Sequence, residues 1–273
     1  MAIGTPGGYG LGPMANPQVR IGFGGPPPPT WSPEDFGTVL LHWATRLNPS
    51  QADGDPAFDA EDFSGNNVDL TVANGPGTAP TYKLPNSTLP FWRADGFDNQ
   101  GFGNTGTHAF SDITFFVVSK APWDQAVSRV SLLFSLGAMT ATNGIGLELI
   151  TSAVVAFPYP TTDRLRLYYE GLNVYADADV SLVLGSGSGV IGVRATATAN
   201  LRLTANGSVR TFHELTGSAS AAYANGGVYL LGRPSFSRDH ERDVSEVVVY
   251  DGALSNTTMD DVTAELMTLY SLT

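Results

Sequence analysis

The stretch that decides the fold lies near the C-terminus, at residues 244–252, and reads VSEVVVYDG. β-Branched and aromatic residues dominate it, which favours a β-strand. Because side chains alternate along a strand, both faces of this one are apolar. Val244, Val248 and Tyr250 lie beside Glu246 on one face, and Val247 and Val249 lie on the other. Such a strand is expected near the centre of a sheet that is covered on both sides.

Short β-rich runs, separated by clusters of Gly, Asn, Asp and Pro, continue this pattern over the rest of the chain. They lie at residues 68–72, 89–94, 113–120, 130–136, 145–150, 164–169, 179–184, 189–195, 199–204, 209–214 and 228–232. No amphipathic helix separates them, so we expect two packed antiparallel sheets rather than β-α-β units. Asn206 and Gly207 stand between alternating runs and predict a type I′ hairpin, in which both residues take positive φ.

Both ends of this β-rich region contain helix signals. Residues 255–270 predict a helix with Ser255 as N-cap and Leu254 packed on Met259, covering a sheet edge or one end of the sandwich. Ser32 and Pro33 begin one helical turn. Residues 39–44 favour a strand, although an apolar spacing of three to four residues leaves a helix open.

Composition excludes several classes of function. The chain has 273 residues, 14 Lys and Arg against 26 Asp and Glu, and a net charge of −12. A chain of this charge is repelled by phosphate backbones and anionic membranes, so neither nucleic acid nor a membrane is an expected partner. Without cysteine there is no disulfide framework, thiolate nucleophile or cysteine-ligated zinc. No run approaches the roughly 18 apolar residues of a membrane span, and the N-terminus lacks a signal-peptide pattern.

Residues 1–30 differ from the rest, because 8 of them are glycine and 7 are proline. Two interpretations are open: a solvated tail, or a docking arm that becomes ordered on a partner. Spaced apolar side chains favour the arm, and the candidate assembly contacts among them are Tyr9, Leu11, Met14, Ile21 and Phe23. We expect residues 31–273 to form one domain.

Four sets of segments together resemble a known family. They are LHW at 41–43 with DFSGNNVDLT at 62–71 and PTY at 80–82, RADGFD at 93–98, LRLTANG at 201–207, and VSEVVVYDGALS at 244–255. From about residue 31 to residue 270, the chain resembles the LamG-like, concanavalin A-like lectin and glucanase jelly-roll domains of bacterial surface proteins and tailed-bacteriophage structural proteins. The resemblance implies an all-β, antiparallel jelly-roll sandwich with a short C-terminal helix and an extended N-terminal arm. Sugar binders, glycosidases and structural modules share that fold, so function has to be argued from side chains.

The side chains give no catalytic pair. A jelly-roll glycosidase needs two carboxylates that flank one bond, most simply on alternate residues of a strand. Glu246 and Asp251 are five positions apart, and the four histidines are scattered along the chain. The expectation is therefore a protein that is not an enzyme.

Candidate binding residues are few. The aromatic and polar combinations suited to a sugar are Trp92, Arg93, Trp123, Asp124 and Tyr168. Core packing explains Trp92 equally well, whereas Trp123 and Asp124 stand in a predicted loop and are the better exposed candidates. A last set of candidate assembly contacts, which internal ion pairs would explain as well, is Arg233, Arg238 and Arg242.

An acidic loop is a candidate calcium site, with Asp53, Asp55 and Asp59 as oxygen ligands. A solvated loop is the alternative, and no other cofactor is expected.

The arm and the resemblance together predict a virion structural protein on the outside of the particle. Its expected partners are other capsid or tail proteins, further copies of itself and, weakly, a host surface glycan. Head and tail locations both fit. The alternatives are a glycosidase acting on polysaccharide and a free bacterial surface lectin.

Overall fold

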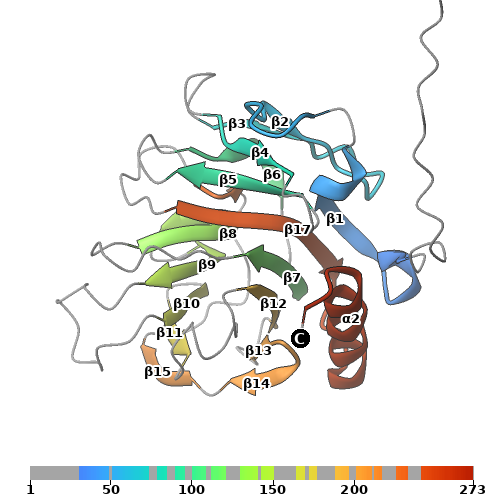
Figure 1. Cartoon of the computed structure of the whole chain (residues 1–273). Helices are drawn as coiled ribbons and strands as arrows, with labels where there is room; N and C mark the ends of the chain where they lie inside the picture. The colour runs from blue at the N-terminus through green and yellow to red at the C-terminus, as the bar shows by residue number, and fades with distance from the viewer. Residues whose placement is uncertain are drawn as a thin grey trace, which may run out of the picture. The chain divides into compact units, whose positions relative to one another are not determined.

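In the part of the chain that the structure describes, two antiparallel sheets pack face to face (Figure 1). The computed structural model describes residues 31–48, 51–73, 79–84, 90–95, 100–108, 112–120, 130–140, 143–150, 164–169, 172–176, 188–196, 201–210, 212–216, 226–232 and 241–272. The predicted arm, the strand expected at 179–184, and Trp123, Asp124, Arg233 and Arg238 lie outside these residues.

In the described part of the chain, sheet A has eight strands. In spatial order they are β14 (Ser208–Arg210), β13 (Arg202–Ala205), β12 (Ser188–Ala195), β7 (Ile113–Lys120), β17 (Glu241–Asp251), β5 (Phe91–Asp95) and β4 (Thr81–Lys83), with β1 (Val39–Ala44) also paired to β17. The sequence left a helix open at residues 39–44, and the structure has a strand there.

Sheet B has nine strands within the described residues. In spatial order they are β15 (Phe212–Thr216), β11 (Leu172–Ala176), β10 (Arg164–Tyr169), β9 (Asn143–Ile150), β8 (Val130–Thr140), β16 (Gly226–Leu230), β6 (Phe102–His108), β3 (Leu70–Val72) and β2 (Asp59–Ala60). The sequence did not predict β2, β4, β6 or β11, because these segments are short, rich in glycine or poor in alternating apolar residues.

The predicted central strand is confirmed. β17 pairs with β7 along one side and with β5 and then β1 along the other. One detail of the prediction is wrong: a β-bulge between Val244 and Glu246 shifts the alternation. Val244 therefore lies in the core between the sheets, whereas Val248 and Tyr250 lie on the outer face with Glu246.

Aromatic side chains fill the space between the sheets. Phe134 of β8 packs on Trp43 of β1 and Phe115 of β7, with ring centroids 6.2 and 5.1 Å away. Trp92 of β5 packs on Phe102 of β6 at 5.4 Å. These rings are fully or almost fully buried, so burial of apolar surface is the main source of cohesion between the sheets.

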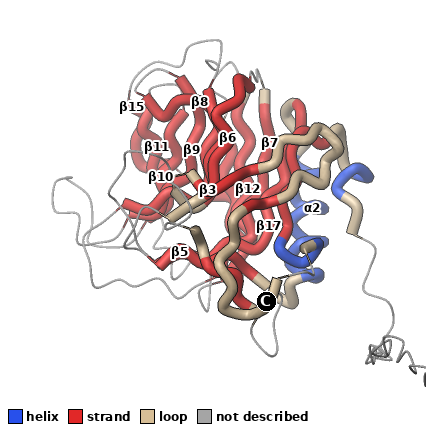
Figure 2. The backbone as a smooth tube through the Cα atoms, turned by 90° about the horizontal axis from the view of Figure 1, so that it is seen from above, coloured by secondary structure: helices blue, strands red, loops and turns tan. Residues whose placement is uncertain are grey.

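The C-terminal helix α2 (Asn256–Leu269) covers the outer face of sheet A, not an edge or an end of the sandwich as the sequence suggested. Its buried side chains Met259, Val262 and Leu266 pack on apolar residues of sheet A that include Phe116 and Val248. In Figure 2, α2 lies on the side of β12 and β17, and β15, β11 and β9 lie on the other side. No helix in the described ranges has the length and apolar character needed to cross a bilayer.

Local signals in the sequence are confirmed where they depend on near neighbours. Ser255 caps α2 by accepting a hydrogen bond from the amide of Thr258. Asn206 and Gly207 both have positive φ, at 46° and 76°, as a type I′ hairpin requires. The predicted turn at the start is a 3₁₀ helix, η1 (Pro33–Asp35), and a second 3₁₀ helix, η2 (Thr45–Leu47), follows β1.

The loop between β2 and β3 is fastened to β1 by Asp62. This buried carboxylate accepts the backbone amides of His42, Ser64 and Val68, and the hydroxyl of Ser64. Its own amide donates to the carboxylate of Asp69. These bonds fix the edge of sheet B where β2 and β3 meet.

Candidate functional site

One row of strand partners crosses sheet B from β15 to β2. Its members in register are Thr216, Asn173, Tyr168, Gly146, Ser135, Tyr229, Gly103, Thr71 and Asp59. Successive side chains of a strand point to opposite faces of the sheet. The neighbours of these residues along the chain, such as Val228 and Leu230, lie in the core, so the described side chains of the row point outward. The row places polar, aromatic and glycine residues on one outer surface.

Among the side chains of this row that the structure describes, Tyr229 is the partly exposed aromatic one. Its ring lies against Gly103, where a β-carbon would stand 2.8 Å from Cδ1 and 2.9 Å from Cε1 of the ring. Gly227 leaves room in the same way, since a β-carbon there would be 2.9 Å from the tyrosine hydroxyl oxygen. The two glycines therefore let the ring lie close to the backbone of the sheet.

Beyond Gly103, the row continues through the exposed residues Thr71 and Asp59. We call Tyr229, Gly103, Thr71 and Asp59 the Tyr229 platform. With about 4.8 Å between neighbouring strands, its four strands span about 14 Å. That length suits two or three sugar rings laid along the surface.

On the other side of Tyr229, the same face holds buried polar groups. Ser135 is fully buried, and its hydroxyl has no hydrogen-bond partner in the described chain. In the neighbouring row, Arg166 of β10 binds Glu148 of β9 through Nε at 2.8 Å and also through Nη2. Both side chains of this pair are about 95% buried. The ion pair therefore lies on the outer face of sheet B without being open to solvent.

The structure separates the residues that the sequence had proposed for sugar binding. Trp92 is 1% exposed and lies in the core, so its prediction as a sugar-binding ring is wrong. Arg93 faces outward from sheet A, where it binds the buried Asp243 at 2.8 and 2.7 Å and lies over Phe91. Tyr168 belongs to the row of sheet B described above.

The remaining predicted contacts are only partly visible. Arg242 lies in β17 opposite Ala94, and its side chain is not among those described. The other candidate residues lie outside the part of the chain that the structure describes. They are Tyr9, Leu11, Met14, Ile21 and Phe23 of the predicted arm, and Arg233, Arg238, Trp123 and Asp124.

The predicted calcium ligands take up other roles. Asp53 accepts the amide of Leu84, Asp55 accepts the amide of Ala52, and Asp59 pairs with Thr71 across β2 and β3. Among the described residues, no three His, Asp or Glu side chains gather closely enough to hold a metal ion. The structure therefore does not bring these aspartates together as ligands.

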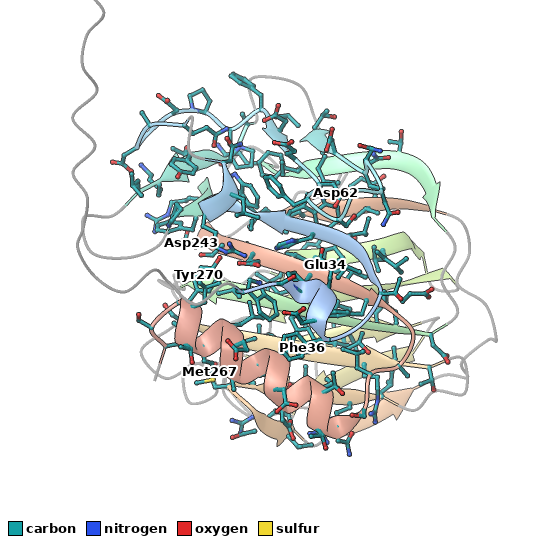
Figure 3. The ribbon with its side chains drawn as sticks, turned by 90° about the vertical axis from the view of Figure 1, so that its right-hand side faces the viewer. Glu34, Phe36, Asp62, Asp243, Met267 and Tyr270 are labelled. Atoms are coloured by element: carbon teal, nitrogen blue, oxygen red, sulfur yellow. The ribbon has the colours of Figure 1, made fainter. Side chains whose placement is uncertain are left out.

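A second polar centre, which the sequence did not predict, surrounds Glu246 on the outer face of sheet A. Figure 3 labels one of its members, Tyr270. Its carboxylate is fully buried and receives hydrogen bonds from four residues. They are His42 (2.8 Å), Arg46 (2.9 and 3.0 Å), Trp31 (2.9 Å) and Tyr270 (2.7 Å). We call these five residues the Glu246 cluster. It joins Trp31, β1, η2 and Tyr270, which directly follows α2, to the central strand.

Charge and burial oppose each other within the Glu246 cluster. Burial raises the pKa of Glu246, but hydrogen bonds from His42 and Arg46 and the charge of Arg46 outweigh it and lower the pKa to about 2. Burial, followed by the charge of Glu246, raises the pKa of Tyr270 well above its ordinary value. Glu246 is thus ionised and Tyr270 protonated at neutral pH, as a stable structural cluster requires.

The two sheets and the C-terminal helix define a concanavalin A-like antiparallel jelly-roll sandwich, as the sequence predicted. Trypanosoma rangeli sialidase has this arrangement in part of its chain: the TM-score is 0.53 at 14% identity, over 84% of this chain and 33% of the sialidase. The binding domain of Paraclostridial Mosquitocidal Protein 1 gives a TM-score of 0.57 at 12% identity, over 84% and 52%. A structure of botulinum neurotoxin type C gives 0.55 at 10%, over 84% and 51%.

This chain therefore spans about a third of the sialidase and about half of the toxin structures. At such identities the likeness establishes the fold. No protein-family model matches the chain, and no curated protein matches it either.

The expectation that the protein is not an enzyme has to be corrected. Solved structures with this fold include sialidases as well as binding domains of toxins. The sequence shows no carboxylate pair, but proteins that contain this fold include both enzymes and binding proteins. The fold is therefore no ground for excluding catalysis.

Proposed function

We propose that the protein is a carbohydrate-binding β-sandwich and that the Tyr229 platform on sheet B contacts the sugar. The observation that carries this proposal is the ring of Tyr229, partly exposed and laid close to the sheet over Gly103. A flat aromatic surface packs on the C–H face of a sugar ring, and nearby hydroxyls and carboxylates fix its orientation. Thr71 and Asp59 supply such groups in the same row.

Proteins of similar fold support a sugar as the ligand class. Trypanosoma rangeli sialidase is known in complex with sialic acid. Cell entry of botulinum neurotoxin type C depends on interaction with two ganglioside molecules. In this chain, the Tyr229 platform offers an aromatic ring with a hydroxyl and a carboxylate beside it, which suits such a ligand.

Replacing Tyr229 by alanine tests the proposal. We expect the variant to lose tenfold or more of its affinity for any glycan that the native protein binds, because stacking on one aromatic ring contributes about 1.4 kcal/mol or more. Binding to a glycan array, followed by titration of the best ligand, measures this loss. Val209→Ala is the matched control, since Val209 is 58% exposed and lies on sheet A. Unchanged glycan binding by Tyr229→Ala would refute the assignment of the site.

We further propose that this sandwich is displayed on the exterior of a virion, in several copies, and that residues 1–30 dock it to neighbouring capsid or tail proteins. The composition of residues 1–30 supports this proposal: half are glycine or proline, with apolar side chains spaced between them.

Deletion of residues 2–30 tests the docking role. We expect the shortened protein to keep its melting temperature and glycan binding, because the described sheets, α2 and the Glu246 cluster all begin at or after residue 31. It should be missing from purified particles assembled in its presence, as measured by mass spectrometry. Incorporation at the native level would contradict a docking arm.

A further inference from the structure

The Tyr229 platform has a charge pattern that selects among sugars. Three exposed carboxylates lie at its outer end: Asp59 in β2, Glu61 directly after it, and Asp69 directly before β3. Asp59 is itself a member of the platform, opposite Thr71. A glycan that stacks on Tyr229 and extends along the row therefore meets negative charge.

In the described strands of the platform, His108 at the end of β6 is the only residue that can carry positive charge. β16, β6, β3 and β2 contain neither lysine nor arginine within their described bounds. On the same face, Arg166 is already bound to Glu148 and is 4% exposed. A sugar carboxylate would have to break this buried ion pair to reach the guanidinium, which costs free energy.

We propose that the platform binds neutral saccharides and discriminates against acidic ones such as sialylated glycans. This inference rests on the proposed function and assigns its ligand class. It sets this chain apart from the structures of similar fold that are known with sialic acid. The net charge of −12 acts in the same direction, because a polyanionic protein repels an anionic ligand at every distance within the screening length.

The test uses pairs of oligosaccharides that differ only in a terminal sialic acid, lactose and 3′-sialyllactose among them, printed on one array. Native protein, Tyr229→Ala and Glu61→Gln are compared at 20 mM and 500 mM salt. We expect the neutral member of a bound pair to bind about threefold or more tightly at 20 mM salt, and the difference to shrink at 500 mM. In Glu61→Gln, binding of the sialylated member should rise about twofold at low salt, with neutral binding unchanged, because Glu61 is exposed beside the platform and is not one of its members.

The outcomes separate the two proposals. In one outcome, the sialylated members bind as tightly as the neutral ones or more tightly, and Tyr229→Ala abolishes this binding. That result would overturn the neutral-sugar inference and leave the glycan site in place. Binding to either member that persists in Tyr229→Ala, or no binding to any pair, would overturn the site itself. A neutral preference that depends on Tyr229 and weakens with salt supports both.

Discussion

Glu246→Ala is expected to lower the free energy of unfolding by about 3–5 kcal/mol, because it leaves buried donors and a charge without their acceptor. Arg46 is only 16% exposed at its side chain, and the indole of Trp31 and the hydroxyl of Tyr270 also donate to this carboxylate. Urea unfolding at pH 7 measures the loss. Glu265→Ala is the control: this exposed glutamate of α2 should cost less than about 0.5 kcal/mol.

The same cluster makes stability depend on pH. Since the pKa of Glu246 is lowered from 4.5 to about 2 on folding, its ionisation stabilises the protein above pH 4.5, and that contribution disappears as the pH falls from 4.5 towards 2. Glu246→Gln lacks this titration. Between pH 4.5 and 2, its stability should therefore fall less steeply than that of the native protein. Parallel curves, or a loss below 1 kcal/mol in Glu246→Ala, would show that the cluster does not hold Trp31, β1 and Tyr270 to the central strand.

Asp62→Ala is the second large prediction, with an expected loss of about 2–4 kcal/mol. The substitution leaves the backbone amides of His42, Ser64 and Val68 without their shared acceptor, and a buried donor without a partner is costly. Urea unfolding measures the effect, and hydrogen exchange should show faster exchange at these three amides.

Asp261→Ala provides the matched control for Asp62, because Asp261 is an exposed aspartate of α2. It should change stability by less than about 0.5 kcal/mol. Equal stabilities of the Asp62 and Asp261 variants would mean that water replaces the carboxylate without loss, and that the loop is not fastened through it.

The parts of the fold that could be predicted from the sequence depend on local chemistry. Ser255 caps α2 through a residue three positions later, and Asn206 and Gly207 form their turn within the hairpin itself. The bulge at Ser245 could not be predicted in this way. Ser245 accepts a hydrogen bond from Thr45, which is 200 residues away in the chain, so the register of the central strand depends on a tertiary contact.

The candidate site was missed for a related reason. Tyr229 reads as an ordinary strand residue, and the glycine that lets its ring lie flat is Gly103, on a strand that the sequence did not predict. The available signal was Gly227, which directly precedes the predicted run at 228–232, since a glycine in a strand often marks close approach of another group. For Trp92 the error is the reverse, because the sequence predicted binding where there is none. A large aromatic ring was a candidate for sugar binding, but it lies on the inner face of β5 and is buried.

The Glu246 cluster was also beyond sequence reasoning. Its partners Trp31, His42 and Arg46 lie 215, 204 and 200 residues from Glu246 along the chain. Only the pairing of β1 with β17 brings them together. The sequence does show a glutamate, Glu246, within an apolar strand. Such a glutamate indicates that hydrogen-bond donors from elsewhere in the chain surround its buried carboxylate.

Glycan binding at the Tyr229 platform is tested most directly by following backbone amide resonances while the protein is titrated with the neutral oligosaccharide that binds best on the array. We predict shifts that saturate at Tyr229, Gly103 and Thr71 and spare α2. Saturating shifts confined to α2 and the outer face of sheet A, or no saturable shift at any tested concentration, would contradict the platform as the sugar site.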